Sequence, residues 1–117
     1  MAVSKIKPIA ENVSDKFTIN AAWTNQRKKA WKIGNLVFFQ LSGVTSSYTA
    51  NYMYDFATID SSIQPKTVGD FVCHKGDSNF NLLGLFEVHI NSTSNKIQVN
   101  TSNTSGNYWY VNGWYEV

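Results

Sequence analysis

Three features of the 117-residue sequence predict an all-β fold. Segments in which apolar and polar residues alternate are separated by turn signals roughly every eight to twelve residues. No segment shows the apolar period of a helix. Aromatic residues make up 15% of the chain and charged residues also 15%, and Ser, Thr and Asn dominate the polar remainder, which favours strands and hydrogen-bonding loops. About eight short strands are expected, arranged as an antiparallel two-sheet β-sandwich of jelly-roll type.

The clearest element is a hairpin within residues 31–44, where a turn directly precedes a long apolar strand. Gly34 and Asn35 provide the positive-φ positions that a two-residue hairpin requires. Alternate residues from Val37 to Leu41 then fall on one face, as in a half-buried strand. This pattern predicts a fold and not a function.

Weaker signals place the other elements of the first half. Residues 17–21 are expected to form a short strand, and residues 23–29 a polar turn before the hairpin. After the hairpin, residues 45–54 form a long loop rich in Tyr and small polar residues. Residues 55–59 then form a weak strand.

The second half continues the pattern after Pro65, which marks an extended or edge segment. A strong turn signal lies at residues 75–79, and Asn95 can take a left-handed conformation in a later hairpin. Gly113 lies inside the last strand, where we expect a bulge at Asn112 and Gly113. The strands of this half are expected at residues 68–74, 82–90, 96–99 and 108–117.

The length fits one domain, which buries about two-thirds of its unfolded surface. Residues 1–16 lack a sustained period and contain Pro8, so we expect a leader or connector there, at the place where a stalk would attach in a longer protein. Residues 17–117 are expected to form the β-sandwich domain.

Charge and cysteine content limit the partners that we expect. The formal net charge is +2, too small for a typical nucleic-acid binder. Four basic residues cluster, and a solvated turn explains them better than a patch for an anionic ligand: Arg27, Lys28, Lys29 and Lys32. Cys73 is the single cysteine, so no internal disulfide can form, and its apolar neighbours predict a buried, inert thiol. No apolar run or leader pattern indicates a membrane span or signal peptide, so we expect synthesis in a cytoplasm.

No motif indicates catalysis, a metal or a cofactor, and none is expected. Glu87 and His89 fit a satisfied pair on the outer sheet or at a subunit contact better than a general acid and base. Asp55 and Asp60 could form the carboxylate pair of a glycosidase only if they faced each other. Surface polar residues explain Asp70, His74 and Asp77 better than a metal site does.

Aromatic residues exceed what one small core can bury, because each ring buries about 150 to 250 Å². Phe residues in strands, together with Trp31 and Tyr115, are assigned to the core. Rings in or beside polar loops could equally be lids over the sandwich ends or a ligand platform: Tyr48, Tyr52, Tyr54, Tyr108 and Trp109. Sugars suit such a platform, because pyranose faces stack on rings while polar side chains bind hydroxyls.

The order of four motifs resembles the C-terminal head domain of bacteriophage tail-fibre and baseplate receptor-binding proteins. These motifs, which span roughly residues 30–117, are Lys32-Ile-Gly-Asn-Leu36, Ala57-Thr-Ile59 before Pro65, Val88-His-Ile90 and Gly113-Trp-Tyr115. The resemblance implies a homotrimeric head on a virion fibre or baseplate. Such a head recognises a saccharide of the bacterial cell wall and reaches the cell exterior by lysis of the host.

Together these observations predict a non-catalytic phage receptor-binding domain, made in the bacterial cytoplasm and carried on the virion. Its partners would be a cell-surface saccharide, two copies of itself and other tail or baseplate proteins, with no nucleic acid or membrane. The alternative is a purely structural virion component. Apolar side chains on faces opposite the core rows are candidates for subunit contacts: Phe38, Leu83 and Leu85. The saccharide site is expected at Tyr48, Tyr52, Tyr54, Asp55, Asn107 and Trp109.

Overall fold

The computed structural model describes residues 9–46, 48–101 and 106–117, and it confirms an all-β, antiparallel fold. No helix within these ranges is long and apolar enough to cross a bilayer. Two short 3-10 turns, η1 (Ser14–Lys16) and η2 (Ser61–Ile63), lie between strands. The strands are β1 (Ala10–Asn12), β2 (Phe17–Ile19), β3 (Thr24–Ile33), β4 (Leu36–Val44), β5 (Tyr52–Ile59), β6 (Gly69–Gly76), β7 (Leu82–Asn91), β8 (Lys96–Thr101) and β9 (Tyr108–Glu116).

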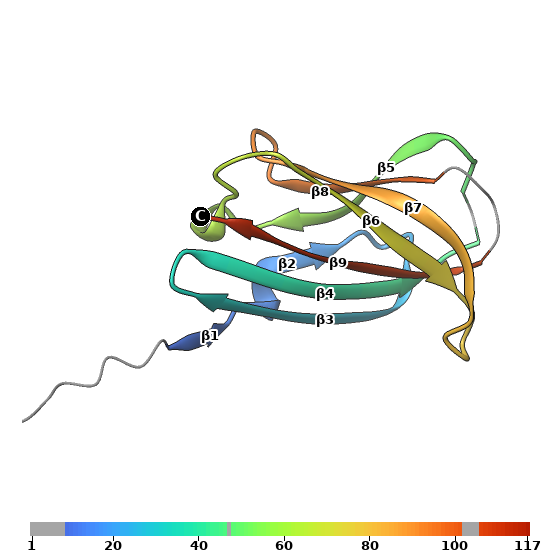
Figure 1. Ribbon diagram of the computed structural model, residues 1–117, viewed down its shortest axis with the longest axis horizontal. Helices are drawn as coiled ribbons and strands as arrows, with labels where there is room; N and C mark the ends of the chain where they lie inside the picture. The colour runs from blue at the N-terminus through green and yellow to red at the C-terminus, as the bar shows by residue number, and fades with distance from the viewer. Residues whose placement is uncertain (1–8, 47, 102–105) are drawn as a thin grey trace, which may run out of the picture.

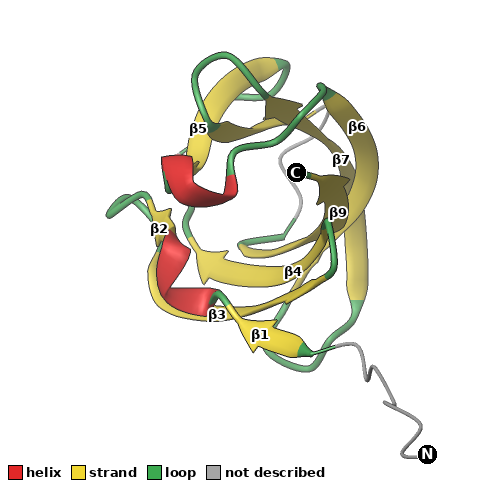
Figure 2. Ribbon diagram, turned by 90° about the vertical axis from the view of Figure 1, so that its left-hand side faces the viewer, coloured by secondary structure: helices red, strands yellow, loops and turns green. Residues whose placement is uncertain are grey.

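The strands form one strongly curled sheet in the order β1-β3-β4-β9-β6-β7-β8-β5-β2. In Figure 1 β3, β4 and β9 form the lower layer and β5 to β8 the upper one, and Figure 2 shows the curl end-on. The two layers are continuous, not separate sheets as expected, because β9 pairs with β6. That joint is short and involves three pairs, His74–Tyr110, Lys75–Trp109 and Gly76–Tyr108. Three antiparallel pairs are nested in the chain order: β6 with β7, β5 with β8, and β4 with β9.

The expected polar turn at residues 23–29 is wrong, because this segment is most of strand β3. Among its residues only Ala30 is buried, so the strand carries almost no apolar alternation. Side chains of β3 close the curl toward β2. The Lys28 ammonium donates to the Phe17 carbonyl oxygen at 2.9 Å, and the Gln26 amide donates to the carbonyl oxygens of Ile19 and Asn20. Lysine-rich polar edges of this kind are typical of sheets that must not pair with other chains.

Residues 10–16, assigned to the leader, pack on the domain. Strand β1 pairs with β3 through Trp31 to Ile33. Val13 is buried in the core, and its backbone N–H donates to the Ala30 carbonyl oxygen at 2.9 Å. The Ser14 hydroxyl accepts from the Ala30 N–H. Both backbone polar groups of Ala30, its N–H and its carbonyl, are therefore hydrogen-bonded to this segment.

Two predicted turns are confirmed. Gly34 and Asn35 join β3 to β4, but the expected positive φ at Asn35 is wrong: φ is positive at Gly34 and not at Asn35, the pattern of a type II′ hairpin. Asn95 takes a left-handed conformation with φ of 55° before β8.

The predicted bulge at Gly113 is wrong, because β4 and β9 pair without a register shift from Leu36 to Val44. A Cβ at Gly113 would lie 2.8 Å from Cζ of Phe39 and 3.1 Å from Cε2 of Phe71. The glycine therefore makes room for core rings that cross the strand.

The core is lined by the inner residues of both layers. Val37, Phe39 and Leu41 are buried as predicted, as is Tyr115. The assignment of Trp31 to the core is wrong: it is 39% exposed on the outer face of β3, because it follows the inward-facing Ala30.

We predict that Gly43→Ala lowers the free energy of unfolding by about 1 to 3 kcal/mol, the usual cost of overpacking a core. A Cβ at this position would lie 2.7 Å from Cβ of Trp23. Gly69→Ala is the matched control, since its nearest contact would be 3.5 Å, and it should change stability by less than about 0.5 kcal/mol. Urea unfolding measures both; equal effects would contradict this packing.

Candidate functional site

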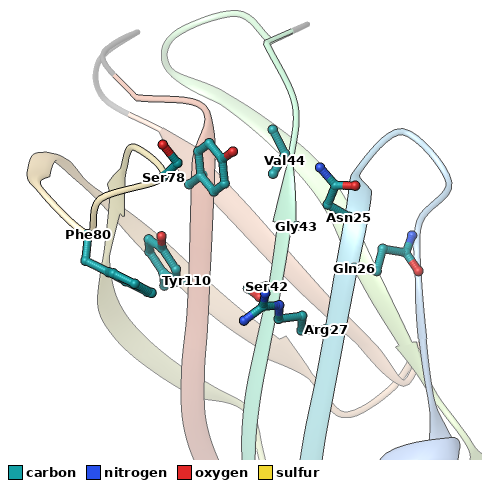
Figure 3. A pocket seen from close by; sticks show the side chains of 10 residues that line it. Asn25, Gln26, Arg27, Ser42, Gly43, Val44, Ser78, Phe80 and Tyr110 are labelled. Carbon is teal, nitrogen blue, oxygen red and sulfur yellow. The ribbon is translucent and has the colours of Figure 1, made fainter.

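A groove runs over the outer face of β3, β4 and β9. It consists of two adjoining hollows, of about 470 and 430 Å³, which share Arg27, Ser42, Phe80 and Tyr110. Figure 3 shows Arg27 extending beside Ser42 toward the side on which Tyr110 and Phe80 lie. The other described residues that line the groove are Asn25, Gln26, Lys28, Lys29, Gln40, Leu41, Gly43, Val44, Ser78, Tyr108 and Asn112.

Cross-strand register builds the floor of the groove. Arg27, Ser42 and Tyr110 form one row across three strands. Lys29, opposite Gln40, begins the next row, which continues to Asn112. Neighbouring strands lie about 4.8 Å apart, so each row presents its side chains at about that spacing.

Arg27 is oriented by an irregularity in β3. The register between β3 and β4 shifts between Thr24 and Arg27, and Asn25 within the shift has φ of 49°. Such bulges redirect side chains and occur next to binding sites. Asn is well suited to this position because it tolerates the left-handed conformation.

Aromatic rings form the opposite wall. The Tyr110 ring stacks on His74 with centroids 4.8 Å apart and planes at 27°, and it lies 5.9 Å from the ring of Phe80. Phe80 comes from the β6–β7 turn and is 72% exposed. Its φ is 62°, a conformation that costs a bulky residue about 1 to 2 kcal/mol. The turn therefore holds an exposed ring beside Tyr110 at an energetic cost.

The turn that carries Phe80 is fixed by Asp77. One carboxylate oxygen of Asp77 accepts from the backbone N–H groups of Asn79 and Asn81, and the other accepts from the Asn81 amide at 2.9 Å. These bonds hold the pKa of Asp77 below its ordinary value. The Tyr110 hydroxyl donates to the Asp77 carbonyl oxygen at 3.2 Å, and burial raises the Tyr110 pKa. Wall and turn are thus one hydrogen-bonded unit.

The expectation that Trp109 is an exposed sugar platform is wrong. Trp109 is fully buried, and its ring centroid lies 4.9 Å from those of Tyr48 and Phe86 and 5.8 Å from that of Trp23. Its indole N–H donates to the Thr45 carbonyl oxygen. The alternation of β9 points Trp109 inward and its neighbours Tyr108 and Tyr110 toward the groove.

Tyr48 is a lid over the core and not an open platform. Its hydroxyl donates to the Gly106 carbonyl oxygen at 2.6 Å and accepts from the Lys75 ammonium at 3.1 Å. Lys75 is fully buried, donates to the Thr101 hydroxyl at 3.0 Å, and lies over the rings of Tyr48 and Trp109. Removal from water lowers its pKa to about 8.

Tyr52, Tyr54 and Asp55 lie on β5, away from the groove. Tyr52 is exposed and its ring centroid is 5.4 Å from that of Tyr54. The Asp55 carboxylate accepts from the Lys96 ammonium at 2.8 Å and from the Gln98 amide at 3.0 Å, and these bonds lower its pKa. The six expected site residues are therefore not brought together.

Asn107 is exposed and acts through its backbone. Its carbonyl oxygen accepts from the Thr45 N–H at 3.0 Å, and its N–H donates to the Gly76 carbonyl oxygen. It lies next to Tyr108, a groove residue, but does not line the groove among the described residues.

The other candidates have structural roles. The Asp60 carboxylate caps η2 by accepting from the Ser62 N–H, so it is committed locally and does not face Asp55 across a pocket. His89 contacts Asp70 through Nδ1 and Glu87 through Nε2, the latter at 3.3 Å, which confirms an outer-sheet pair.

Cys73 is buried, and burial raises its pKa as expected of an inert thiol. The described ranges contain no group of three residues able to hold a metal ion.

No known family model and no curated protein sequence matches the chain. The functional argument therefore rests on the groove. Two signals in the sequence pointed toward it: the basic cluster that begins at Arg27, and the period of two from Tyr115 back to Trp109, which places Tyr110 outward.

We predict that raising the pH stabilises the protein relative to Lys75→Met. The folded pKa of about 8 lies below the ordinary 10.5, so the unfolded chain binds more protons between these values and stability rises with pH there. Between about pH 7 and pH 10 the stability difference should shift by on the order of 2 kcal/mol in favour of the wild type. Urea unfolding of both proteins at each pH measures it. A pH-independent difference would contradict the lowered pKa of Lys75.

Proposed function

We propose that the protein is a non-catalytic saccharide-binding domain and that the groove is its binding site. The observation that carries this proposal is the pairing of an exposed aromatic wall with a polar floor. Phe80 and Tyr110 offer ring faces. Ser42, paired with Tyr110, offers a hydroxyl group, and Gln40 and Asn112 offer amide groups in the next row.

Saccharides fit this chemistry because a pyranose has apolar faces and a rim of hydroxyls. The rings bind the face, and the amides donate to and accept from the rim. Each hydrogen bond contributes only about 0.5 to 1.5 kcal/mol after water is displaced, so one groove binds modestly. The described lining residues include no carboxylate or imidazole, which supports binding without hydrolysis.

The proposal extends to the phage context that the motif order implies: a receptor-binding head on a virion, attached to other tail or baseplate proteins and directed at a bacterial surface saccharide. The nested strand pairs β6·β7, β5·β8 and β4·β9 support a jelly-roll topology, since winding a long hairpin produces such pairs.

Two separate apolar patches support assembly into a ring. An aromatic strip, formed by Trp31, Phe38 and Trp114, lies in one cross-strand row and is 39%, 42% and 52% exposed. A leucine patch on β7, formed by Leu83 and Leu85 on the outer face of the strand, is also exposed. Two different patches favour a head-to-tail contact, which closes into a cyclic oligomer such as a trimer. Three grooves on one particle would then raise attachment through effective concentration.

We predict that Tyr110→Ala and Phe80→Asn each weaken saccharide binding by about tenfold, the effect of losing a stacking ring. Asn relieves the backbone strain at position 80, so Phe80→Asn should keep or raise the free energy of unfolding. A glycan array followed by calorimetry on the best ligand makes the measurement.

Tyr52→Ala is the matched control, because this ring is exposed but lies outside the groove. It should leave affinity unchanged. Loss of binding in Tyr52→Ala, with full binding in both groove variants, would move the site to β5 and contradict the proposal.

We predict that the chain is a trimer at micromolar concentration and that Trp114→Ser or Leu85→Ser each produces monomers. Light scattering coupled to size exclusion measures this. A head-to-tail contact joins the strip of one copy to the leucine patch of the next, so mixing the two variants should restore dimers but no trimers. A monomeric wild type, or a Leu85→Ser variant that still forms trimers, would contradict the proposed cyclic trimer.

A purely structural virion component is the second candidate, and the two apolar patches favour it. It predicts assembly without glycan binding, and the array separates it from the first.

A further inference from the structure

The charge of the groove indicates which saccharides it takes. Its described lining residues include Arg27, Lys28 and Lys29 and no Asp or Glu. The whole chain is nearly balanced, with ten basic and eight acidic residues. Positive charge is thus concentrated at the groove. The sequence predicts a solvated turn for the basic cluster. The cluster lies instead in strand β3, beside the groove.

Not all three cations serve the same purpose. The Lys28 ammonium donates to the Phe17 carbonyl oxygen and so belongs to the closure of the sheet. Arg27 and Lys29 lie on the outer face, in register with Ser42 and Gln40, and no ion pair joins them to a carboxylate of the described residues. These two cations are placed to meet a ligand.

The carboxylate nearest in the chain to the aromatic wall, that of Asp77, is engaged within its own turn and does not line the groove. Both of its oxygens accept hydrogen bonds from Asn79 and Asn81. The polar floor therefore donates hydrogen bonds and carries positive charge, while the rings of the aromatic wall are uncharged.

We propose that the groove is selective for an anionic saccharide, in which carboxylate or phosphate groups alternate with sugar rings along the polymer. Arg27 holds the anion, Lys29 adds a second charge, and Phe80 and Tyr110 stack on the adjacent ring. This inference rests on the proposed saccharide-binding function.

The residue types fit that ligand chemistry. A guanidinium presents a planar fork that makes two parallel hydrogen bonds to a carboxylate or phosphate, whereas an ammonium acts as a point charge. The bulge at Asn25 sets the direction of the fork, and the ring wall lies across β4 from it. An anion at Arg27 therefore leaves the neighbouring sugar opposite Phe80 and Tyr110.

The test is an array of bacterial capsular and cell-wall oligosaccharides in matched charged and neutralised forms: uronic acids with their methyl esters, and phosphorylated chains with their dephosphorylated counterparts. Inorganic phosphate alone is included. Calorimetry on the best ligand pair then compares the wild type with Arg27→Gln, Arg27→Lys and Lys66→Gln. Lys66 is an exposed lysine that does not line the groove and provides the matched loss of charge.

We expect the charged form to bind at least about tenfold more tightly than its neutralised form, and Arg27→Gln to abolish that preference. Arg27→Lys should keep part of that preference, and Lys66→Gln should keep all of it. Added salt should weaken the charged ligand and leave the neutral one unchanged. The carboxylate and phosphate pairs show which anion is the natural one.

Equal binding of both forms, with groove variants still impaired, would overturn anion selectivity and leave the saccharide proposal standing. Binding of inorganic phosphate as tightly as any saccharide would mean an anion site without sugar recognition and would also overturn it. Absence of binding to every saccharide would overturn both proposals together.

Discussion

The position of Trp109 is the constraint on which the rest of the structure depends. Its ring contacts those of Trp23, Tyr48 and Phe86, each from a different part of the chain. The Lys75 ammonium lies over the Trp109 ring. It also lies in the three-pair joint through which β9 meets β6 and the two layers become one sheet. Because side chains alternate along a strand, burying this ring forces Tyr110 to the outer face. Core packing thus fixes the aromatic wall of the groove.

Strand β3 combines two roles that explain its polarity. The residues directed toward β2, Gln26 and Lys28, donate to backbone carbonyls and close the curl without a further row of strand hydrogen bonds. Arg27 and Lys29, which alternate with them, face the groove. A strand that closes a sheet with its side chains has little need of an apolar face, and its outer side is then available for charge. Its long polar side chains also block pairing of that edge with other chains.

The sequence predicted those parts of the fold that local patterns encode. The Gly34 turn and the alternation from Val37 to Leu41 depend on neighbouring residues only, so both were predictable. Strand β3 was not, since it has one buried residue in its whole length. The predicted site was wrong for a related reason. Trp109 was expected as an open ring beside a polar loop, whereas the alternation of β9 directs it inward and Tyr110 outward. The groove itself arises from long-range register and from the left-handed conformation of Phe80, which no local pattern announces.

Two residues with positive φ border the groove, and they differ in cost. Asn25 accepts that conformation readily, whereas Phe80 loses about 1 to 2 kcal/mol and leaves most of its ring in water. An exposed apolar ring on a strained backbone contributes little to folding, because its main contact is the neighbouring Tyr110 ring. Asp77 stabilises the turn with three hydrogen bonds and so offsets the strain. Local strain that surrounding structure supports in this way is typical of binding sites. The turn is therefore better explained by the proposed contact of the ring with a saccharide than by the stability of the free domain.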